Sequence, residues 1–208
     1  MKLIELTLND YLALLGSDAP APGGGSASAL CGAQGAQLAG MVARLTLGRA
    51  KYAEYHTLCE ETALKCDQLA ARLAQAVDRD TEAYNLISAA FKLPKETEEE
   101  KAARKQAVAD ATLTATQVPF DTLCLAAEGL CHCEALVGKS NVNAASDLGV
   151  AALNLNACAN GAWLNVRINL SGVKDEAAAA HFETEGKRLL AEAQERAARI
   201  AAQLAEAM

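Results

Sequence analysis

The sequence contains few aromatic residues, few prolines and few histidines. Aromatic residues make up only 4% of its 208 residues, and it contains four prolines and three histidines. We find no alternation of apolar and polar residues of any length, and no internal repeat. These absences argue against a β-sheet protein or a repeat array. Alanine and leucine dominate instead, which favours long, closely packed helices in one domain large enough to bury a core.

Positive charge is also scarce, because 26 acidic residues against 19 lysines and arginines give a formal net charge of −7. This balance argues against nucleic acid or an anionic membrane as a partner. The most apolar stretch, residues 27–47, is interrupted by two glutamines and an arginine, so it predicts a buried central helix and no membrane span. Residues 1–15 contain Glu5 and Asp10 and show no signal peptide, so we expect a cytoplasmic protein.

The seven cysteines do not follow the pattern of a metal site or of a disulfide framework. Their number is odd, and they lie within helical stretches. Cys131 and Cys133 flank His132, but positions two apart on a helix point to different faces, which argues against a closed zinc site. Cys59 and Cys66 are seven apart and share a face. We therefore expect buried, reduced thiols and no bound metal.

Breaking and capping residues divide the chain into long helices joined by short loops. Residues 1–208 are expected to form a single all-α domain, a multihelical bundle of mostly antiparallel helices. The expected helices cover residues 7–16, 26–47, 52–91, 97–138 with a kink or restart at Pro119, 146–170 and 175–205. Core candidates in the third helix are Leu58, Leu69, Leu73, Val77 and Leu86.

Two features of these helices predict close packing against other helices or a second subunit. The helix over residues 52–91 would span roughly 60 Å, which is longer than one compact domain usually needs. Gly32, Ala36 and Gly40 form a stripe of small residues on one face of the preceding helix. Such a stripe permits close approach, so we expect it at the centre of the bundle or at a subunit interface.

The segment that says most about function is Pro20 to Leu30, PAPGGGSASAL. The three glycines at 23–25 let the backbone approach another surface closely, and at a helix N-terminus their N–H groups would form a cradle for a ligand. No Gly-Lys-Ser/Thr follows and no strand precedes, which excludes a Walker loop and a dinucleotide fingerprint. The structural alternative is a turn in which Ser26 or Ser28 caps the helix.

This segment, followed by MVARLTLGRAKY at 41–52, resembles the opening of the cyclodeaminase/cyclohydrolase family of tetrahydrofolate enzymes. Three further blocks fit in the expected order: DRDTEAY at 78–84, KLPKETEEEKAAR at 92–104, and NAASDLGVAAL into NVRINL between 143 and 170. The family includes bacterial methenyltetrahydrofolate cyclohydrolases and the cyclodeaminase half of formiminotransferase-cyclodeaminase. The resemblance covers nearly the whole chain.

The resemblance implies a one-carbon folate enzyme that acts as a homodimer and needs no metal or redox cofactor. The first reading is a cyclodeaminase, which converts 5-formiminotetrahydrofolate to 5,10-methenyltetrahydrofolate and ammonia. Its partner would be a separate formiminotransferase that supplies the 5-formiminotetrahydrofolate. A cyclohydrolase, which opens the methenyl ring with water to give 10-formyltetrahydrofolate, is close behind, and both activities are compatible. A catalytically silent folate-binding or assembly module stays open as a third reading.

Both reactions pass through a tetrahedral carbon and need a group that moves protons. No histidine lies in the family-like blocks, so carboxylates are the better candidates. We expect Asp147, at the start of a helix, and Asp80, in the DRDTEAY block, to be catalytic, with Asp147 ahead. The structural alternatives are a helix cap for Asp147 and a solvated face for Asp80.

The predicted substrate-binding residues lie in the same blocks. A folate is anionic through its glutamate tail, so a net-acidic protein must gather positive charge locally, and we expect lysines 92 and 95 and Arg167 to do so. The paired asparagines 165 and 169 share a helix face and suit either the pterin ring or a polar subunit interface. The full set is Gly23, Gly24, Gly25, Ser26, Tyr84, Lys92, Lys95, Asn143, Asn165, Arg167 and Asn169.

Overall fold

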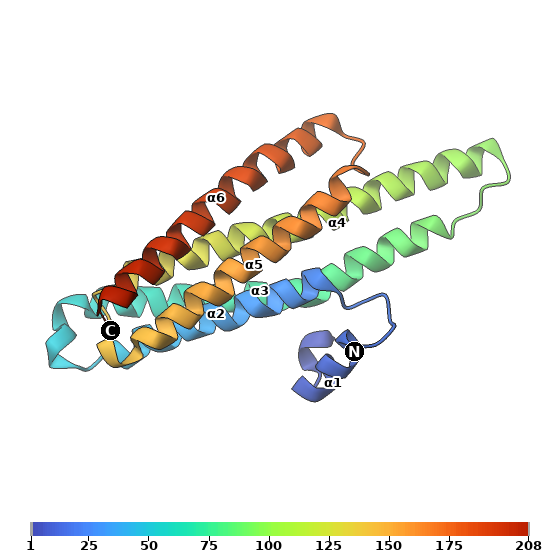
Figure 1. Ribbon diagram of the computed structural model, residues 1–208. Coiled ribbons are helices and arrows are strands. Elements are labelled where there is room, and N and C mark those ends of the chain that lie inside the picture. The colour runs from blue at the N-terminus through green and yellow to red at the C-terminus, as the bar shows by residue number, and fades with distance from the viewer. Residues whose placement is uncertain (1, 208) are drawn as a thin grey trace.

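The computed structural model describes residues 2–207, and this part of the chain is built from helices and contains no strand (Figure 1). The all-α prediction is thus confirmed. The elements in chain order are η1 (Leu3–Glu5), α1 (Leu8–Leu15), α2 (Gly24–Thr46), η2 (Ala50–Tyr55), α3 (His56–Phe91), α4 (Glu98–Leu136), η3 (Val142–Ala144), α5 (Ala145–Leu170) and α6 (Glu176–Ala207).

The longest helices, α3 and α4, run side by side as an antiparallel hairpin whose closed end projects beyond the other helices (Figure 1). A capping box begins α4: the Thr97 side chain accepts from the Glu100 N–H, and the Glu100 carboxylate accepts from the Thr97 N–H at 3.1 Å. This reciprocal pair satisfies two N–H groups that no helix turn can reach.

Helix α2 lies at the centre of the bundle, packed along α3 and α5. Its small-residue stripe is buried, as predicted: a Cβ on Gly32 would lie 2.6 Å from the Cys158 Sγ, and a Cβ on Gly40 would lie 3.3 Å from the Cys66 Cβ. The absence of side chains at these positions lets α3 and α5 approach α2 closely. Helix α6 covers α4 and α5 from outside (Figure 1).

The core prediction for α3 is correct in its first part and wrong at Leu86. Leu69, Leu73 and Val77 are buried, and Leu58 is half-buried. Leu86 is 52% exposed, because it lines a groove formed only by α3, α4 and the connection between them. No third helix covers this side of the hairpin in the described structure, so helical periodicity alone misplaced the residue.

Several predicted helix ends need correction. Helix α2 begins at Gly24, two residues before Ser26, so neither Ser26 nor Ser28 is its N-cap. Helix α5 begins at Ala145, and its N-cap Ala144 makes no side-chain bond, so Asp147 does not cap it. Helix α4 continues through Pro119 without a restart. Its start and its end near Gly138 agree with the prediction.

The cysteines are all free, and four of the seven are buried. Burial raises the pKa of the Cys66 and Cys158 thiols to about 12, which keeps them protonated and unreactive. Cys131 departs from the prediction, because it is exposed at the surface of α4. Within residues 2–207 no group of three metal-ligating side chains occurs, and no helix there is long and apolar enough to cross a membrane.

Candidate functional site

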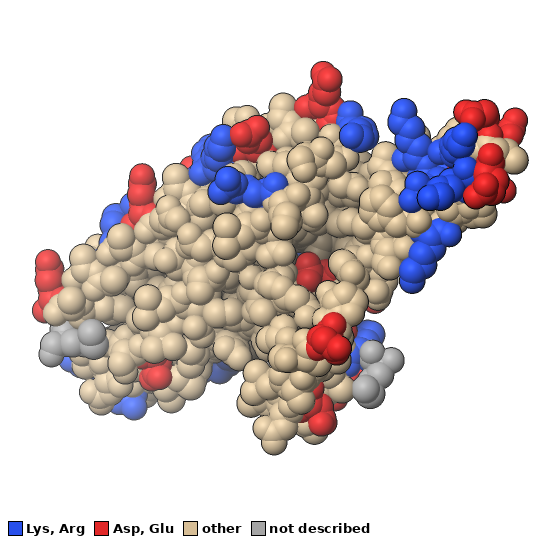
Figure 2. Space-filling model, turned by 45° about the vertical axis from the view of Figure 1, so that its right-hand side comes forward, with Lys and Arg blue, Asp and Glu red and all other residues tan. Residues whose placement is uncertain are grey.

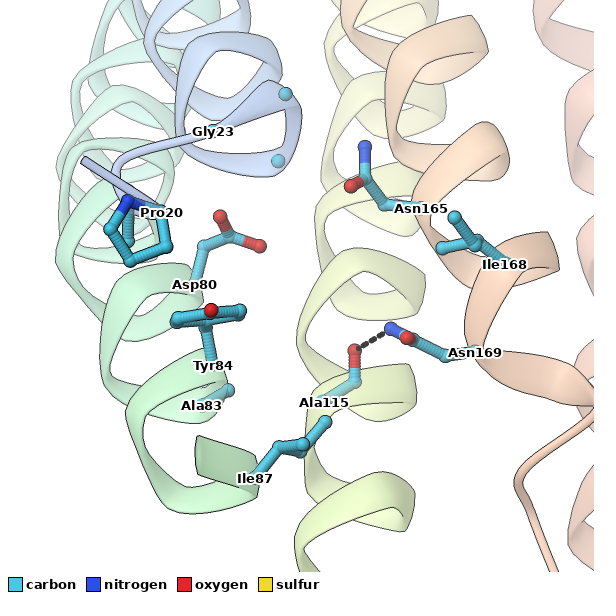
Figure 3. A pocket seen from close by; sticks show the side chains of 13 residues that line it. Pro20, Gly23, Asp80, Ala83, Tyr84, Ile87, Ala115, Asn165, Ile168 and Asn169 are labelled. Carbon is cyan, nitrogen blue, oxygen red and sulfur yellow. Dashed lines mark hydrogen bonds between the residues drawn. The ribbon is translucent and has the colours of Figure 1, made fainter. Parts of the chain in front are cut away.

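A cavity of about 300 Å³ opens where the start of α2 faces the last turns of α3 and α5 (Figure 3). Residues of four helices and of the loop before α2 contribute to it. Its lining consists of Pro20, Ala21, Gly23, Gly24, Gly25, Asp80, Ala83, Tyr84, Ile87, Ala115, Asn165, Ile168 and Asn169. Seven of these belong to the predicted site, so the structure brings together residues that lie up to 146 positions apart in the sequence.

Asp80 is the only ionisable carboxyl among the residues that line this cavity. Its Oδ2 accepts a hydrogen bond from the Ser26 backbone N–H at 2.8 Å. The Ser26 hydroxyl lies 3.0 Å from the same oxygen and 2.8 Å from the Val77 carbonyl oxygen. Ser26 is fully buried and does not line the cavity, so it acts as the support that holds the carboxylate.

Two opposing effects set the pKa of Asp80. Burial is the larger and raises the pKa above its ordinary 3.8, because removal from water disfavours the charged form. The two hydrogen bonds from Ser26 favour the carboxylate and offset part of that rise. The oxygen also faces the positive end of α2. A carboxyl held in this way is suited to accepting and returning a proton.

Of the three glycines, Gly25 is the one that Asp80 requires. A Cβ on Gly25 would overlap all three atoms of the Asp80 carboxylate group. A Cβ on Gly24 would make an ordinary contact of 3.5 Å with the Asn165 side chain, and one on Gly23 would meet nothing within 4 Å. The glycine triplet thus allows the carboxylate to reach the Ser26 N–H, and Gly23 is not sterically constrained.

The wall opposite Asp80 is formed by α5, which presents Asn165, Ile168 and Asn169 (Figure 3). The Asn169 amide donates to the Ala115 carbonyl oxygen at 2.8 Å. That oxygen is four residues before Pro119, which has no N–H to offer it. Asn169 therefore fills the hydrogen bond that the proline leaves open, and this link fixes α5 against α4 beside the cavity.

The remaining lining is mostly apolar. Tyr84, 40% exposed, follows Asp80 by one turn of α3, and Ile87 follows Tyr84. Ile168 faces them from α5. The isoleucines and Ala115 were absent from the predicted site. Ile87 and Ile168 each lie three residues from a predicted member on the same helix face, which is the signal that would have found them.

Besides Ser26, five predicted residues lie outside this cavity. Asp147 and Asn143 stand at the other end of α5, where Asp147 precedes Asn165 by 18 residues, or about 27 Å of helix. Arg167 is exposed on another face of α5. The structure therefore does not bring Asp147 and Asp80 into one site. Lys92 and Lys95 belong to the connection between α3 and α4.

The chain is similar to known proteins over nearly its whole length. The model of the formiminotransferase-cyclodeaminase family matches residues 7–188. A methenyltetrahydrofolate cyclohydrolase of Methylorubrum extorquens is 40% identical over 187 residues, which cover 90% of each chain. A formimidoyltransferase-cyclodeaminase of Sus scrofa is 33% identical over 198 residues, which cover 95% of this chain and 37% of that protein. The chain thus spans little more than a third of the pig relative.

The same likeness holds in three dimensions. The crystal structure of a formiminotetrahydrofolate cyclodeaminase from Thermotoga maritima matches with a TM-score of 0.89 and 25% sequence identity, covering 99% of this chain and 98% of that one. Since the family model spans most of the chain and a relative 40% identical extends over nine-tenths of it, the chain belongs to the formiminotransferase-cyclodeaminase family.

Proposed function

We propose that this protein is a one-carbon folate enzyme whose main activity is that of a methenyltetrahydrofolate cyclohydrolase. The observation that carries this choice is the 40% identity to the Methylorubrum extorquens enzyme, with which the chain is nearly coextensive. The sequence alone placed the cyclodeaminase first. The cavity suits both substrates, because one apolar slot with amides on its wall accommodates a pterin ring.

In this proposal Asp80 is the proton-transfer residue. Water adds to the positively charged methenyl carbon, and its proton passes to the Asp80 carboxylate, which leaves a neutral tetrahedral carbon between N5 and N10. The bond from this carbon to N5 then breaks, N5 takes the proton from Asp80, and the remaining hydroxyl proton is released to solvent. The products are 10-formyltetrahydrofolate and one proton. The raised pKa of Asp80 supports this role, because the group must be able to hold the proton between the two steps.

The ionised carboxylate would also favour the bound cation. A methenyl group spreads one positive charge over N5, the carbon and N10, and a carboxylate in a partly buried cavity attracts it more strongly than one in water. Asn165 and Asn169 supply amide groups on the opposite wall to orient the ring. The reaction balances with water and protons alone, so we propose that no cofactor takes part.

A cyclodeaminase is the second candidate, favoured by the likeness to the Thermotoga maritima structure. Here N10 attacks the 5-formimino carbon, Asp80 takes the N10 proton and passes it to the departing nitrogen, and a further proton from solvent allows ammonia to leave. A separate formiminotransferase would have to make the substrate. The same carboxylate serves both reactions, because both form a tetrahedral carbon flanked by nitrogens.

We also propose that the enzyme is a homodimer. Along one face of α5, four large apolar residues, Val150, Leu153, Leu164 and Ile168, are between 46% and 76% exposed. An apolar face of this length supports burial against a second copy, and Ile168 would bring that copy to the edge of the cavity. Light scattering after size-exclusion chromatography should give twice the chain mass of 21.7 kDa; the mass of a single chain would contradict the proposal.

A paired ultraviolet assay tests the activity. The protein is given 5,10-methenyltetrahydrofolate in one cuvette and 5-formiminotetrahydrofolate in the other, each against an uncatalysed blank. We expect faster loss of methenyl absorbance in the first. Faster gain in the second cuvette alone, with ammonia released, would identify a cyclodeaminase. If neither rate exceeds its blank, the enzyme proposal fails and a folate-binding module becomes the better description.

A further inference from the structure

The first helix, α1, is held against the bundle by one side chain. Tyr11 is its only buried residue, at 5% exposure, whereas Leu8 of the same helix is 65% exposed. Figure 1 shows α1 standing to one side of the long helices. The loop that follows α1 leads directly to the Asp80 cavity, where Pro20 and Ala21 form part of the wall. A shift of α1 therefore costs little packing and can move this part of the wall with it.

Tyr11 lies against α2 and α3, close to the contact between Asp80 and Ser26. It belongs to one apolar cluster with Ala29 of α2 and Val77 of α3. Each of these two residues stands three positions, or about one helical turn, from the residue of its own helix that makes the contact. Residues at this spacing share a helix face. The tyrosine ring therefore packs next to the pair that holds the carboxylate.

The Tyr11 hydroxyl is buried and has no hydrogen-bond partner within residues 2–207. Burial raises the pKa of Tyr11 above its ordinary 10.0, and the negative charge of Asp80 raises it further, so the hydroxyl stays a donor at neutral pH. A buried donor without an acceptor is unfavourable, and a phenylalanine would fill the same apolar space without that cost. Both hydrogen bonds to Asp80 in the described structure go to Oδ2, which leaves Oδ1 free to accept one.

We propose that Tyr11 is a positioning residue for Asp80: its hydroxyl donates to the Asp80 carboxylate when α1 moves inward over an occupied cavity. The inference rests on the proposed function and adds a residue to its site. Tyr11 does not line the cavity, so it acts through Asp80 and not on the substrate. The added donor favours the ionised carboxylate, which is the form that takes the proton from water.

Few other titratable groups face Asp80. Tyr84 is the other titratable residue in the cavity lining, to which α2, α4 and α5 contribute only glycine, alanine, asparagine and isoleucine. Near the first helix, Asp78 accepts from a backbone N–H of η1 at 2.5 Å, Arg79 forms an ion pair with α4, and the exposed Asp10 bonds the N-cap threonine of α1. On the face shown in Figure 2, Lys and Arg side chains gather at the projecting end of the α3–α4 hairpin. The titration of Asp80 is therefore the property that a change at Tyr11 should move.

The test is Tyr11→Phe, which removes only the hydroxyl oxygen. We expect its thermal unfolding midpoint to be no lower than that of the wild type, because the ligand-free structure loses no hydrogen bond. On the substrate that the wild type turns over, kcat should fall about tenfold, and the acidic limb of its pH profile should move up by about one pH unit. Tyr52→Phe is the matched control, because the Tyr52 hydroxyl accepts from the Val142 N–H at 3.1 Å, far from the cavity. It should lower the unfolding midpoint and leave the pH profile unchanged.

Carbon-13 NMR of the carboxyl groups, with 5-formyltetrahydrofolate bound, gives a readout that needs no turnover. The Asp80 resonance is assigned by its absence in Asp80→Asn, and its titration midpoint should rise by about one pH unit in Tyr11→Phe. A protein that turns over neither substrate but shows this rise would retain the role of Tyr11 and lose the enzyme assignment.

Turnover with an unchanged pH profile and an unchanged NMR midpoint in Tyr11→Phe would overturn the inference and leave the proposed function intact. A lower unfolding midpoint in Tyr11→Phe with the titration of Asp80 unmoved would identify a purely structural tyrosine and would overturn the inference as well.

Discussion

Asp80 on α3 accepts a hydrogen bond from the Ser26 N–H in the first turn of α2, across 54 residues of sequence. The start of α2 has no side-chain cap of its own, because Gly23 occupies the N-cap position. The carboxylate takes over that function from a neighbouring helix. One contact thus satisfies a helix end, joins two helices and presents a partly buried carboxylate to a cavity.

This relationship predicts how stability depends on pH. Burial raises the pKa of Asp80 above 3.8, so the native protein holds this proton more tightly than the unfolded chain does. The contribution of the group to stability is complete below 3.8 and is lost as the pH rises through the native pKa. The side chain of the Asp80→Asn variant cannot titrate. Its free energy of unfolding should therefore rise relative to that of the wild type as the pH increases from 4 to 7. Urea unfolding of both proteins at pH 4 and pH 7 measures this change. The same difference in unfolding free energy between variant and wild type at the two pH values would contradict the prediction.

The position of the carboxylate depends on Gly25, which predicts unequal effects within the glycine triplet. Gly25→Ala places a methyl group on the Asp80 carboxylate and forces it away from the Ser26 N–H. We expect a loss of about 1–3 kcal/mol of stability and at least a tenfold fall in kcat/KM. Gly23→Ala is the matched control, because its methyl group would meet nothing within 4 Å. Equal losses in thermal unfolding and turnover for the two variants would refute the steric account.

The link between Asn169 and the Ala115 carbonyl predicts a coupling with Pro119. In the wild type, Asn169→Leu leaves a backbone oxygen without a donor and should cost about 1–3 kcal/mol. In a Pro119→Ala background, residue 119 regains an N–H that bonds the same oxygen within α4. The cost of Asn169→Leu should then be smaller by about 1 kcal/mol in a double-mutant cycle of chemical unfolding. Strict additivity would show that the amide does not replace the missing helix bond.

Much of this architecture is readable from the sequence because it depends on local rules. The capping box at Thr97, the buried glycine stripe of α2 and the breaks near Pro94 and Gly138 follow from residue chemistry within a few positions. The pairing of Asp80 with Tyr84, and of Asn165 with Asn169, follows from helical spacing alone.

The remainder depends on which helix ends meet, and periodicity carries no such information. Asp147 was preferred as the proton-transfer residue because it begins a helix beside a polar loop, yet α5 carries it about 27 Å from the end that faces Asp80. Ser26 was predicted to bind substrate, with a helix cap as the alternative, whereas it lies behind Asp80 and its own N–H is the group being capped. The link from Pro119 to Asn169 was invisible, because it requires knowing that α4 continues through the proline.

The most direct test of the account is the turnover of Asp80→Asn measured beside Asp147→Asn, on whichever of the two folate substrates the wild type uses. Asparagine keeps the size of the side chain and an oxygen for the Ser26 N–H, but it cannot carry a proton between substrate atoms. We predict a fall in kcat of roughly 10²- to 10⁴-fold for Asp80→Asn, with circular dichroism unchanged and Asp147→Asn close to wild type. Full activity in Asp80→Asn, or its loss only in Asp147→Asn, would contradict the assignment of Asp80 as the proton-transfer group.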